Sequence, residues 1–599
     1  MKSYRIFAAL VGLVGLTGSA LFRAAAQPPP LSERAANAAI VRWPNGRFVP
    51  DDTREARNYE LGALLEGMDA VWMNSADGRY FNYIKDSVDQ LVGADGSIPT
   101  WKPEGNQLDN LLLGRQLLLL YRVTQEQRYA TAATLLYQQL VHQTRDASEG
   151  SSHKQKHPNQ IGFDALDRTG PFHAEYASTF HRPEAFAEIS HQFKLTDENA
   201  REFRAWDVAG HMMALVDTLD SYPEDDAGRS QLIASLQSDA AVVARRQDDA
   251  SGLWYQALDT RAAQRNYLEA SASCMFVYSL AKGVRRGYLP LSYLGNAERG
   301  YRGILDRFIH TGTGENISIG NYENDSGQQT VPDDPTGVGM FLMASTEMEN
   351  AANISHGRGD TVLVDAWFNS QKRADATGRQ VSFHYKWDDL SNSGYSFLGH
   401  IFRNFGAETE TLYQAPTRAA LNRAQVYVIV SPDIPAKNPS PHYMQPEDAA
   451  QIAEWVKAGG VLVLMENDPA NADLEHLNLL AEHFGIHFNN VLRNRVDGDH
   501  FEMGKVAIEP GGPIFQHAHT AYMKDVCTIS VQSPSVSVLR DHGDVLMATA
   551  QYGKGTVFAT VDPWVYNEYT DGRKLPAEYD NYAAGEELVR WILEQVPGH

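Results

Sequence analysis

The stretch LDNLLLGRQLLLLYRV, residues 108–123, indicates how the first half of the chain folds. Its apolar residues recur at spacings of three and four, the pattern of a helix that buries one face. The pattern recurs between about 50 and 350, with short polar or Gly/Pro links, in YELGALLEGMDAVW (59–72), ATAATLLYQQLV (130–141), AGHMMALVDTL (209–219) and LEASASCMFVYSLAKGV (268–284). These predict antiparallel helical hairpins, which can build a bundle, a solenoid or a closed toroid. No fixed-period repeat is evident, which weighs against the solenoid.

The residue pattern of the sequence changes at about residue 360, where short runs rich in β-branched residues alternate with helical patterns. The runs are TVLVDAWF (361–368), QVYVIVSP (425–432), GGVLVLMEN (459–467) and GTVFATVDP (555–563). Between two of them, residues 446–460 have Pro446 at a helix start and Gly459 at its end, their favoured places. Such alternation predicts a parallel sheet covered by helices. Residues 543–561 predict an appended β-hairpin that turns at 552–555.

Charge and composition exclude several classes of function. The 599 residues include 52 Lys and Arg against 75 Asp and Glu, a formal net charge of −23. This argues against nucleic acid or an anionic membrane surface as a partner, because both require clustered positive charge. Two cysteines, Cys274 and Cys527, cannot form a disulfide framework or a zinc cluster, so both are expected to be buried thiols. The sequence also lacks a phosphate-binding loop, a dinucleotide fingerprint, HExxH and GxSxG.

Residues 1–26 have the features of a secretory signal peptide. Lys2 and Arg5 precede an apolar run, and Ala24-Ala25-Ala26 supplies the small residues of a cleavage site. We therefore expect a periplasmic or secreted bacterial protein; an uncleaved anchor is the alternative reading. No other stretch is long and apolar enough to span a membrane.

Carboxylates in the helical half are the candidates for chemistry. Asp109 lies at a predicted helix start, and Asp164 lies near His153, His157 and Gln160. Asp109 also suits a helix cap, and Asp164 suits an exposed acid in a first helical turn. In a helical toroid, however, the helix N-terminal ends converge on one mouth. Two carboxylates placed there can perform proton chemistry on a sugar.

Several ordered segments between about 50 and 350 resemble glycoside hydrolase family 105, the unsaturated rhamnogalacturonyl hydrolases. Besides residues 59–72, 108–124 and 266–290, they include HPNQIGFDALDRTGPF (157–172), PEAFAEISHQF (183–193), SGLWYQALD (251–259) and DPTGVGMFLMASTEME (334–349). The resemblance implies a six-hairpin (α/α)6 barrel. It also implies substrates that carry a 4,5-unsaturated uronic acid, and hydrolysis that begins by hydration of the vinyl ether.

The resemblance assigns roles to individual residues. Asp164, in QIGFDAL, falls at the general acid/base position, and Asp109 falls at the second catalytic aspartate. It implies four substrate-binding residues: His153, Gln160, Tyr59 and Glu269. No metal or organic cofactor is required, and the implied partners are unsaturated uronate-containing oligosaccharides.

Some positions depart from the family pattern. Gly162 stands where the family has an aromatic residue, and the stretch 191–219 runs on without a cleft-wall segment of roughly thirty residues. Two alternatives to a rhamnogalacturonyl hydrolase therefore stay open. One is an unsaturated glucuronyl hydrolase acting on ulvan or other acidic glycans, and the other is a non-catalytic glycan-binding homologue.

The C-terminal half resembles a class I glutamine-amidotransferase-like domain of flavodoxin-like α/β fold. The resemblance rests on residues 383–412, 443–478 and 562–581. No cysteine occupies a strand-to-helix elbow, so amidotransferase activity is not expected. A polar cluster after the last strand is either a ligand-binding surface or a loop network: Asp562, Tyr566, Glu568, Asp571 and Arg573. The predicted organisation is a signal peptide (1–26), an (α/α)6 domain (27–358) and an α/β domain (359–599).

Overall fold

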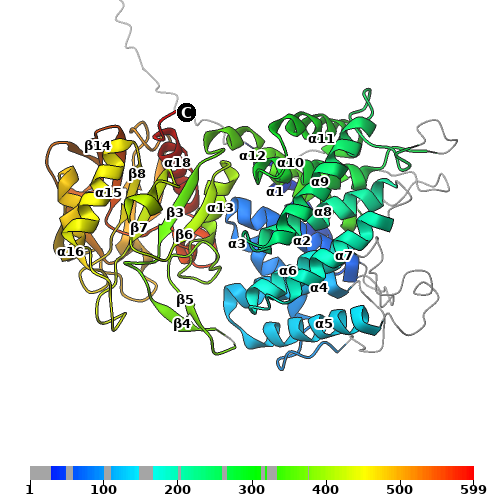
Figure 1. The fold of residues 1–599 in the computed structure, drawn as a ribbon, viewed down its shortest axis with the longest axis horizontal. Coiled ribbons are helices and arrows are strands. Elements are labelled where there is room, and N and C mark those ends of the chain that lie inside the picture. Colours follow the sequence, from blue (N-terminus) through cyan, green and yellow to red (C-terminus); the bar gives the residue numbers. More distant parts are fainter. Residues whose placement is uncertain are drawn as a thin grey trace, which may run out of the picture.

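A helical part and a sheet-containing part lie next to each other along the long axis of the molecule (Figure 1). The computed structural model describes residues 28–48, 58–99, 110–146, 166–199, 204–259, 266–311, 317–319, 334–375 and 377–598. The helical part ends with α12 at Asn350 and the short helix η4 (Ala351–His356), and the first strand of the other part begins at Thr361. No helix among these described residues is both long and apolar enough to cross a membrane.

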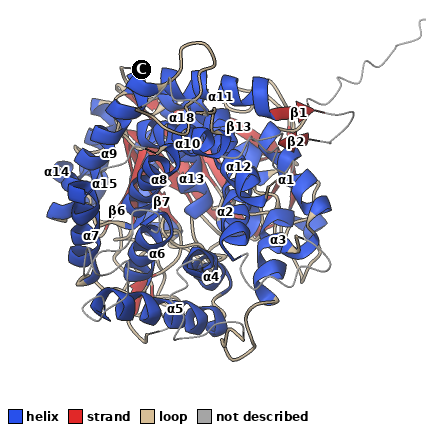
Figure 2. Ribbon diagram, turned by 90° about the vertical axis from the view of Figure 1, so that its right-hand side faces the viewer, coloured by secondary structure: helices blue, strands red, loops and turns tan. Residues whose placement is uncertain are grey.

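Six helices form a closed inner ring, seen end on in Figure 2. Each packs against the next, and the last packs against the first. They are α2 (Asn58–Ser75), α4 (Asn110–Thr124), α6 (Leu166–Thr179), α8 (Ala205–Ser221), α10 (Ala270–Arg285) and α12 (Pro335–Asn350). The ring confirms the predicted toroid of helical hairpins.

An outer layer of helices covers the ring, each packed on an inner one. They are α1 (Leu31–Arg42), α3 (Gly78–Asp89), α5 (Gln127–Asp146), α7 (Ala185–Asn199), α9 (Ala227–Arg246) and α11 (Leu294–Phe308). A short antiparallel pair, β1 (Ile309–Thr311) and β2 (Ile317–Ile319), follows α11. The helical pattern read from residue 50 onwards missed α1, which packs on α12 and α2.

Two glycines let the ring close. A Cβ on Gly339 of α12 would lie 2.1 Å from the carbonyl oxygen of Ala63 in α2, and one on Gly67 of α2 would lie 2.7 Å from the carbonyl oxygen of Gly339. Any larger side chain would push these two helices apart. Because inner helices are covered on nearly every side, α4 buries leucines around its whole circumference, including Leu111, Leu118 and Leu120.

One nine-stranded mixed sheet forms the second part. Five parallel strands run in the order β6 (Glu408–Leu412), β3 (Thr361–Asp365), β7 (Val426–Val430), β8 (Val461–Met465) and β15 (Gly555–Thr560). If these five parallel strands are numbered 1 to 5 along the chain, their order across the sheet is 2-1-3-4-5, an order found in doubly wound sheets. The antiparallel strands β14 (Asp544–Tyr552), β12 (Val526–Val531) and β9 (Ile486–Arg493) continue it, and β13 (Ser535–Asp541) pairs with β14.

The strand predictions are confirmed in position and corrected in one connection. The hairpin predicted within 543–561 exists as β14 and β15, but it is not appended, because β15 pairs in parallel with β8 inside the main sheet. The helix predicted at 446–460 is α15 (Pro446–Ala458), with Pro446 in its first turn and Gly459 as its C-cap at φ 130°. The other helices are α13 (Ser396–Asn404), α14 (Arg418–Leu421), α16 (Leu474–Ala481), α17 (Asn567–Thr570) and α18 (Asn581–Glu594). Two small hairpins, β4–β5 (Lys372–Ala374, Gln380–Ser382) and β10–β11 (Lys505–Ile508, His519–Tyr522), lie outside the main sheet.

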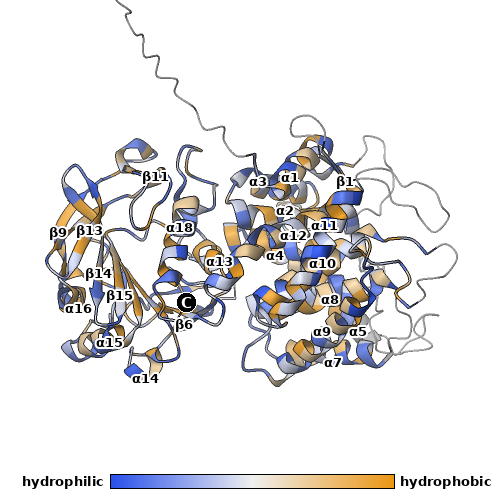
Figure 3. Cartoon of the chain, turned by 90° about the horizontal axis from the view of Figure 1, so that it is seen from above, coloured by the Kyte–Doolittle hydropathy of each residue, from blue (hydrophilic) through white to orange (hydrophobic). Residues whose placement is uncertain are grey.

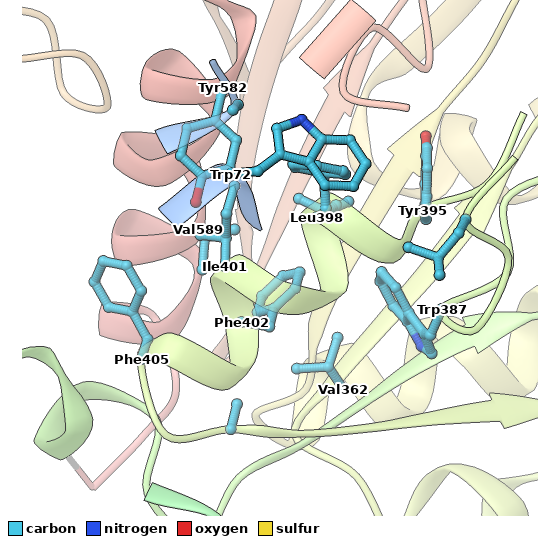
Figure 4. Close-up of a cluster of buried hydrophobic side chains, with 14 of the residues drawn as sticks. Trp72, Val362, Trp387, Tyr395, Leu398, Ile401, Phe402, Phe405, Tyr582 and Val589 are labelled. Carbon is cyan, nitrogen blue, oxygen red and sulfur yellow. The ribbon is translucent and has the colours of Figure 1, made fainter. Parts of the chain in front are cut away.

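The two parts share an apolar contact centred on α13. Seen from above, α13 and α18 lie on the side of the α/β part that faces the ring (Figure 3). Trp72, near the end of α2, reaches across the border and packs on Phe397 of α13 with ring centroids 5.0 Å apart. Figure 4 shows Trp72 with Leu398 of α13 and Tyr582 of α18. All of these side chains are buried, so the border between the two parts is a continuous core.

Candidate active site

In the sequence, the predicted catalytic residues come just before two inner helices. Asp109 immediately precedes Asn110, the first residue of α4, and Asp164 stands two residues before Leu166, the first residue of α6. Asp109, Asp164, His153 and Gln160 lie outside the described residues, and their roles stay predictions. The described residues do show that α4 and α6 are neighbours in the ring.

At this end of the ring, α2 and α6 are joined by a cluster of Tyr59, Asp167 and Arg168. The Tyr59 hydroxyl donates a hydrogen bond of 3.0 Å to Asp167 Oδ2, and Arg168 Nε lies 3.4 Å from Asp167 Oδ1. The Arg168 guanidinium lies 4.8 Å from the centre of the Tyr59 ring, a cation–π distance. Burial, with a contribution from Asp167, holds the pKa of Tyr59 well above its usual value. Tyr59 is therefore a protonated donor fixed in place.

Asp167 is turned towards the inside of the ring. A Cβ added at Gly210 of α8 would lie 3.6 Å from Asp167 Cβ, so the side chain lies against a third inner helix. Neither Asp167 nor Arg168 was among the residues predicted from the sequence to form the site. Two adjacent charges in the first turn of α6 were the signal available.

Glu269 caps the N-terminus of α10. Its carboxylate accepts a hydrogen bond from the backbone N–H of Ala272, and its own φ and ψ are extended, as an N-cap requires. Burial raises its pKa to about 7. Tyr59 and Glu269 thus both lie at the first turns of inner helices, at the same end of the ring as the sequence positions of Asp109 and Asp164.

Asn58 and Asn110 link the first residues of α2 and α4. Asn58 Nδ2 donates a hydrogen bond to Asn110 Oδ1, with both side chains partly buried. This contact fixes the start of α4, and so the backbone directly after Asp109.

Below this end, a charged network crosses the inside of the ring. Arg115 lies five residues into α4, about 7 Å along the helix axis. Its Nη1 lies 2.8 Å from Glu66 Oε1 of α2 and 3.1 Å from Asp217 Oδ2 of α8, and its Nε lies 3.4 Å from Glu175 Oε2 of α6. Burial raises the pKa of Glu66 to about 8 despite the opposing effect of Arg115. Four inner helices therefore meet on one guanidinium.

The sequence did not disclose this network. Its members come from four helices that are far apart in the chain, and each charge is isolated within an apolar pattern. Arg115 in LLLGRQLLLL was the most visible signal.

The polar cluster predicted after the last strand is held by contacts within the protein. Arg573 Nη2 lies 2.7 Å from Asp571 Oδ2, and Asp562 Oδ2 accepts a 2.7 Å hydrogen bond from the backbone N–H of Lys524. The carbonyl oxygen of Asp571 accepts a hydrogen bond from Trp72. These partners correspond to the loop-network interpretation, and they tie the loop to the ring.

Other expected features can be placed in the described part of the chain. Cys274 and Cys527 are both buried, free thiols. Within the described ranges, no group of three or more His, Cys, Asp or Glu side chains is arranged to hold a metal ion.

Known proteins resemble the chain mainly in its helical half. The "24.9 kDa protein in picA locus" of Rhizobium radiobacter is 26% identical over 226 residues, which cover 30% of this chain and 96% of that protein. The unsaturated rhamnogalacturonyl hydrolase YesR of Bacillus subtilis is 23% identical over 306 residues, which cover 46% of this chain and 84% of YesR.

Solved structures also match this half. A family 105 glycoside hydrolase from C. acetobutylicum is 28% identical with a TM-score of 0.48, over 54% of this chain and 99% of that one. An unsaturated glucuronyl hydrolase from Bacillus sp. GL1 is 13% identical with a TM-score of 0.40, over 53% of this chain and 94% of that one.

Two family models match the two parts separately. A model described as a domain of unknown function, DUF4350, matches residues 388–571, so the amidotransferase-like character of the C-terminal part stays a prediction. The model of Glycosyl Hydrolase Family 88 matches residues 31–209 and 204–352, more than half of the chain and all six inner helices. The chain therefore belongs to glycosyl hydrolase family 88.

Proposed function

We propose that the protein releases 4,5-unsaturated galacturonate from the non-reducing end of rhamnogalacturonan oligosaccharides. The observation that carries this proposal is the family match, which spans the closed ring of inner helices. The name of YesR, an unsaturated rhamnogalacturonyl hydrolase, supports the choice of substrate. The proposed reaction is the hydration of a vinyl ether rather than displacement at the anomeric carbon.

Asp164 is the proposed proton donor. Its carboxylic acid protonates C4 of the unsaturated ring, and a water molecule adds its oxygen to C5 while losing a proton to the enzyme. The resulting hemiketal opens, and the neighbouring sugar leaves with its glycosidic oxygen, which takes up a proton. Asp109 assists. The reaction needs the acid form of Asp164 near working pH, which requires its pKa to be raised by burial or by a nearby carboxylate.

Contacts among the described residues support this proposal, because they hold the helix starts that follow Asp109 and Asp164 in the sequence. The Asn58–Asn110 contact fixes the backbone after Asp109, and Asp167 and Arg168 begin the helix that follows Asp164. Tyr59 and Glu269 are the proposed substrate-binding residues, from α2 and α10, the two inner helices on either side of α12. A rigid cluster of this kind favours catalysis because substrate groups are held in one orientation.

The test follows the alkene of the substrate. Rhamnogalacturonan fragments made by a lyase absorb at about 235 nm, and we expect the wild-type protein to remove this absorbance. Asp164→Asn is expected to slow the loss by at least about a hundredfold, in line with loss of a general acid. Asp225→Asn, an exposed acid between α8 and α9, is the matched control and should retain the wild-type rate.

The other readings are separated by the same assay. Faster alkene loss from unsaturated glucuronyl oligosaccharides than from rhamnogalacturonan fragments would move the substrate to glucuronides. Oligosaccharide binding without any alkene loss would make the protein a glycan-binding homologue. Equal, slow rates for wild type and Asp164→Asn would contradict the assignment of Asp164.

We also propose that the protein is exported, on the strength of residues 1–26. Mass spectrometry of the protein from a bacterial periplasm or culture medium should find Gln27 as the first residue. Protein that retains Met1 and remains in the cytoplasm would contradict export.

A further inference from the structure

A large cavity lies at the opposite end of the ring from the candidate active site. Its volume is about 700 Å³, and it is bounded by the C-terminal halves of all six inner helices and by residues 387–409 of the α/β part. Pockets of this size hold small organic ligands. The Arg115 network lies at its inner limit, and neither Tyr59, Asp167, Arg168 nor Glu269 lines it. The cavity is therefore separate from the site proposed above.

One wall of the cavity is rich in cations at the end of α10. Lys282 Nζ lies 2.6 Å from Asp217 Oδ1 and 2.6 Å from Asp220 Oδ2. Arg285 makes a two-pronged contact with Glu347 of α12, through distances of 2.7 and 2.5 Å. Glu347 thus serves Arg285, whereas Lys282 shares Asp217 with Arg115 and Asp220 with Arg286.

Arg286 has a longer ion-pair contact than Lys282 and Arg285 have. Its Nε lies 3.2 Å from Asp220 Oδ1, the carboxylate that Lys282 also engages. Lys282 and Arg286 together hold the pKa of Asp220 below its usual value, so this carboxylate is ionised. Asp220 therefore serves both Lys282 and Arg286, and Glu408, which also lines the cavity, adds to the negative charge near Arg286.

Arg403 of α13 faces this cationic wall from the α/β part. Its Nη1 donates a 2.9 Å hydrogen bond to Thr409 Oγ1, and among the described residues no carboxylate lies within ion-pair distance of its guanidinium. Burial and the nearby positive charges of Arg286 and Arg285 lower its pKa to about 9. A guanidinium in this position is energetically unfavourable unless an anion neutralises it.

His400 lies in the same positive electrostatic environment as Arg403. His400, one helical turn before Arg403, also lines the cavity. Burial, followed by the positive charges of Arg285 and Arg403, holds its pKa well below the usual value. His400 is therefore neutral and does not add to the charge, but it can accept or donate a hydrogen bond.

Two acids of α2, Asp69 and Glu66, offer hydrogen bonds to the cavity. Asp69 of α2 lines the cavity, and its Oδ1 has no hydrogen-bond partner among the described residues. Burial raises the pKa of Asp69 to about 7 and that of Glu66 to about 8, so near neutral pH Glu66 is mostly protonated and Asp69 is protonated in about half of the molecules. Protonated carboxyls both donate and accept hydrogen bonds, as sugar hydroxyls do.

We propose that this cavity is a second ligand site, which binds an acidic monosaccharide with its carboxylate on Arg403 and Arg286 and its hydroxyls towards Asp69 and Glu66. Guanidinium groups bind carboxylates with two parallel hydrogen bonds, and Arg403 has donors free for that geometry. The site lies between the ring and the α/β part, so a bound sugar contacts both. The site does not depend on the reaction proposed for the other end of the ring.

The probe is D-galacturonate, titrated calorimetrically into the full-length protein. We expect saturable binding and a rise in the thermal midpoint, and at least tenfold weaker binding for neutral D-galactose and for inorganic phosphate. Equal binding of galactose would overturn the role of the cations, and equal binding of phosphate would overturn the assignment to a sugar. No saturable binding of galacturonate would overturn the site.

Arg403→Met tests the residue itself. It removes the charge and keeps an unbranched side chain, and we expect at least tenfold weaker galacturonate binding with an unchanged rate of alkene loss. Its thermal midpoint without ligand should equal or exceed that of the wild type, because an uncompensated charge is gone. Arg418→Met, on the exposed surface of α14, is the matched control and should bind as the wild type does.

Two further variants keep the test decisive. If Arg403→Met does not fold, Arg403→Lys retains the charge without the planar fork, and we expect about fivefold weaker binding. Asp164→Asn should bind galacturonate at this cavity unchanged even where alkene loss is abolished. Undiminished binding by the folded Arg403 variant, or loss of binding in Asp164→Asn alone, would overturn the proposal.

Discussion

The indole Nε1 of Trp72 donates a hydrogen bond of 2.8 Å to the main-chain carbonyl of Asp571, a residue 499 positions further along the chain. This bond joins the end of an inner helix to the loop that follows the last strand of the sheet. The ring of Trp72 is fully buried against Phe397 and Phe81. One side chain therefore supplies both apolar contact and a polar link between the two parts.

Shortening Trp72 should destabilise the whole protein. Trp72→Ala is expected to cost about 3–5 kcal/mol, because it leaves a large cavity at the border. Trp72→Phe keeps most of the ring contact but leaves the carbonyl of Asp571 unpaired, at a cost of about 1–3 kcal/mol. Thermal unfolding followed by circular dichroism measures both. Tyr413→Ala, at a side chain 59% exposed, is the control and should change stability by no more than about 0.5 kcal/mol. A Trp72→Phe variant as stable as the wild type would show that the hydrogen bond contributes nothing.

Closure of the ring should be sensitive to one methyl group. Gly339→Ala places a Cβ 2.1 Å from the carbonyl oxygen of Ala63, so α12 must move away from α2. We expect a loss of about 1–3 kcal/mol, the cost of overpacking a core. Gly295→Ala in α11 is the matched control, because the atom nearest to its added Cβ is a nitrogen of the flexible Arg299 side chain at 4.0 Å. That control should be neutral or should stabilise by up to about 1 kcal/mol. Equal midpoints for the two variants would contradict the tight contact of α2 and α12.

The buried His173 should make stability depend on acid pH. Burial lowers its pKa to about 4 in the folded protein, from about 6.5 in the unfolded chain. The unfolded state therefore binds the proton first, and the contribution of neutral His173 is complete above pH 6.5 and lost as the pH falls towards 4. A difference of this size corresponds to about 3 kcal/mol.

The test of His173 compares stability at pH 7 and pH 5. His173→Phe cannot be protonated, so its stability relative to the wild type should improve as the pH falls. His500→Asn removes an exposed histidine and should follow the wild type across the range. A constant difference between wild type and His173→Phe would show that the two states of the chain bind this proton equally.

Glu269 should contribute to stability as a helix cap. Glu269→Ala removes the acceptor for the backbone N–H of Ala272 and is expected to cost about 0.5–2 kcal/mol. Glu269→Gln retains an acceptor oxygen and should lose less. The same two variants test the predicted substrate contact, through KM for the unsaturated oligosaccharide. A raised KM in a fully stable Glu269→Gln supports that contact, whereas an unchanged KM would leave Glu269 as a cap alone.

The elements that the sequence predicted best carry strong local signals. The helix at 446–458 has both Pro446 and Gly459, and α4 is apolar along its whole length. The helix α1 was missed because LSERAANAAIVR, with alanine as its main buried residue type, has a weak apolar pattern. The position of β15 within the sheet was missed because a strand's pattern of residues does not name its partner.

The candidate site was predictable only in part, because a local pattern of residues does not indicate which distant segments come together. Tyr59 and Glu269 lie at helix starts, and their shared end of the ring follows from the topology. The Arg115 network depends on side chains from four helices, and the cavity beneath it depends on side chains from all six inner helices and α13. Arg403, the residue on which the second site depends, comes from the other part of the chain altogether. No spacing along the chain predicts such a meeting.

The contact of α12 with α2 can form only late in the synthesis of the chain on the ribosome. Asn350 bonds to Asn74 across 276 residues, so α2 emerges long before its last neighbour exists. At about 5–20 residues per second, the wait is roughly 15–55 s. During that time one apolar face of α2 has no partner. The hydrogen-bond acceptor of Trp72 is made later still, because Asp571 follows α12 in the chain. A chain truncated within α12 would never cover that face, so such fragments should be held by chaperones or degraded.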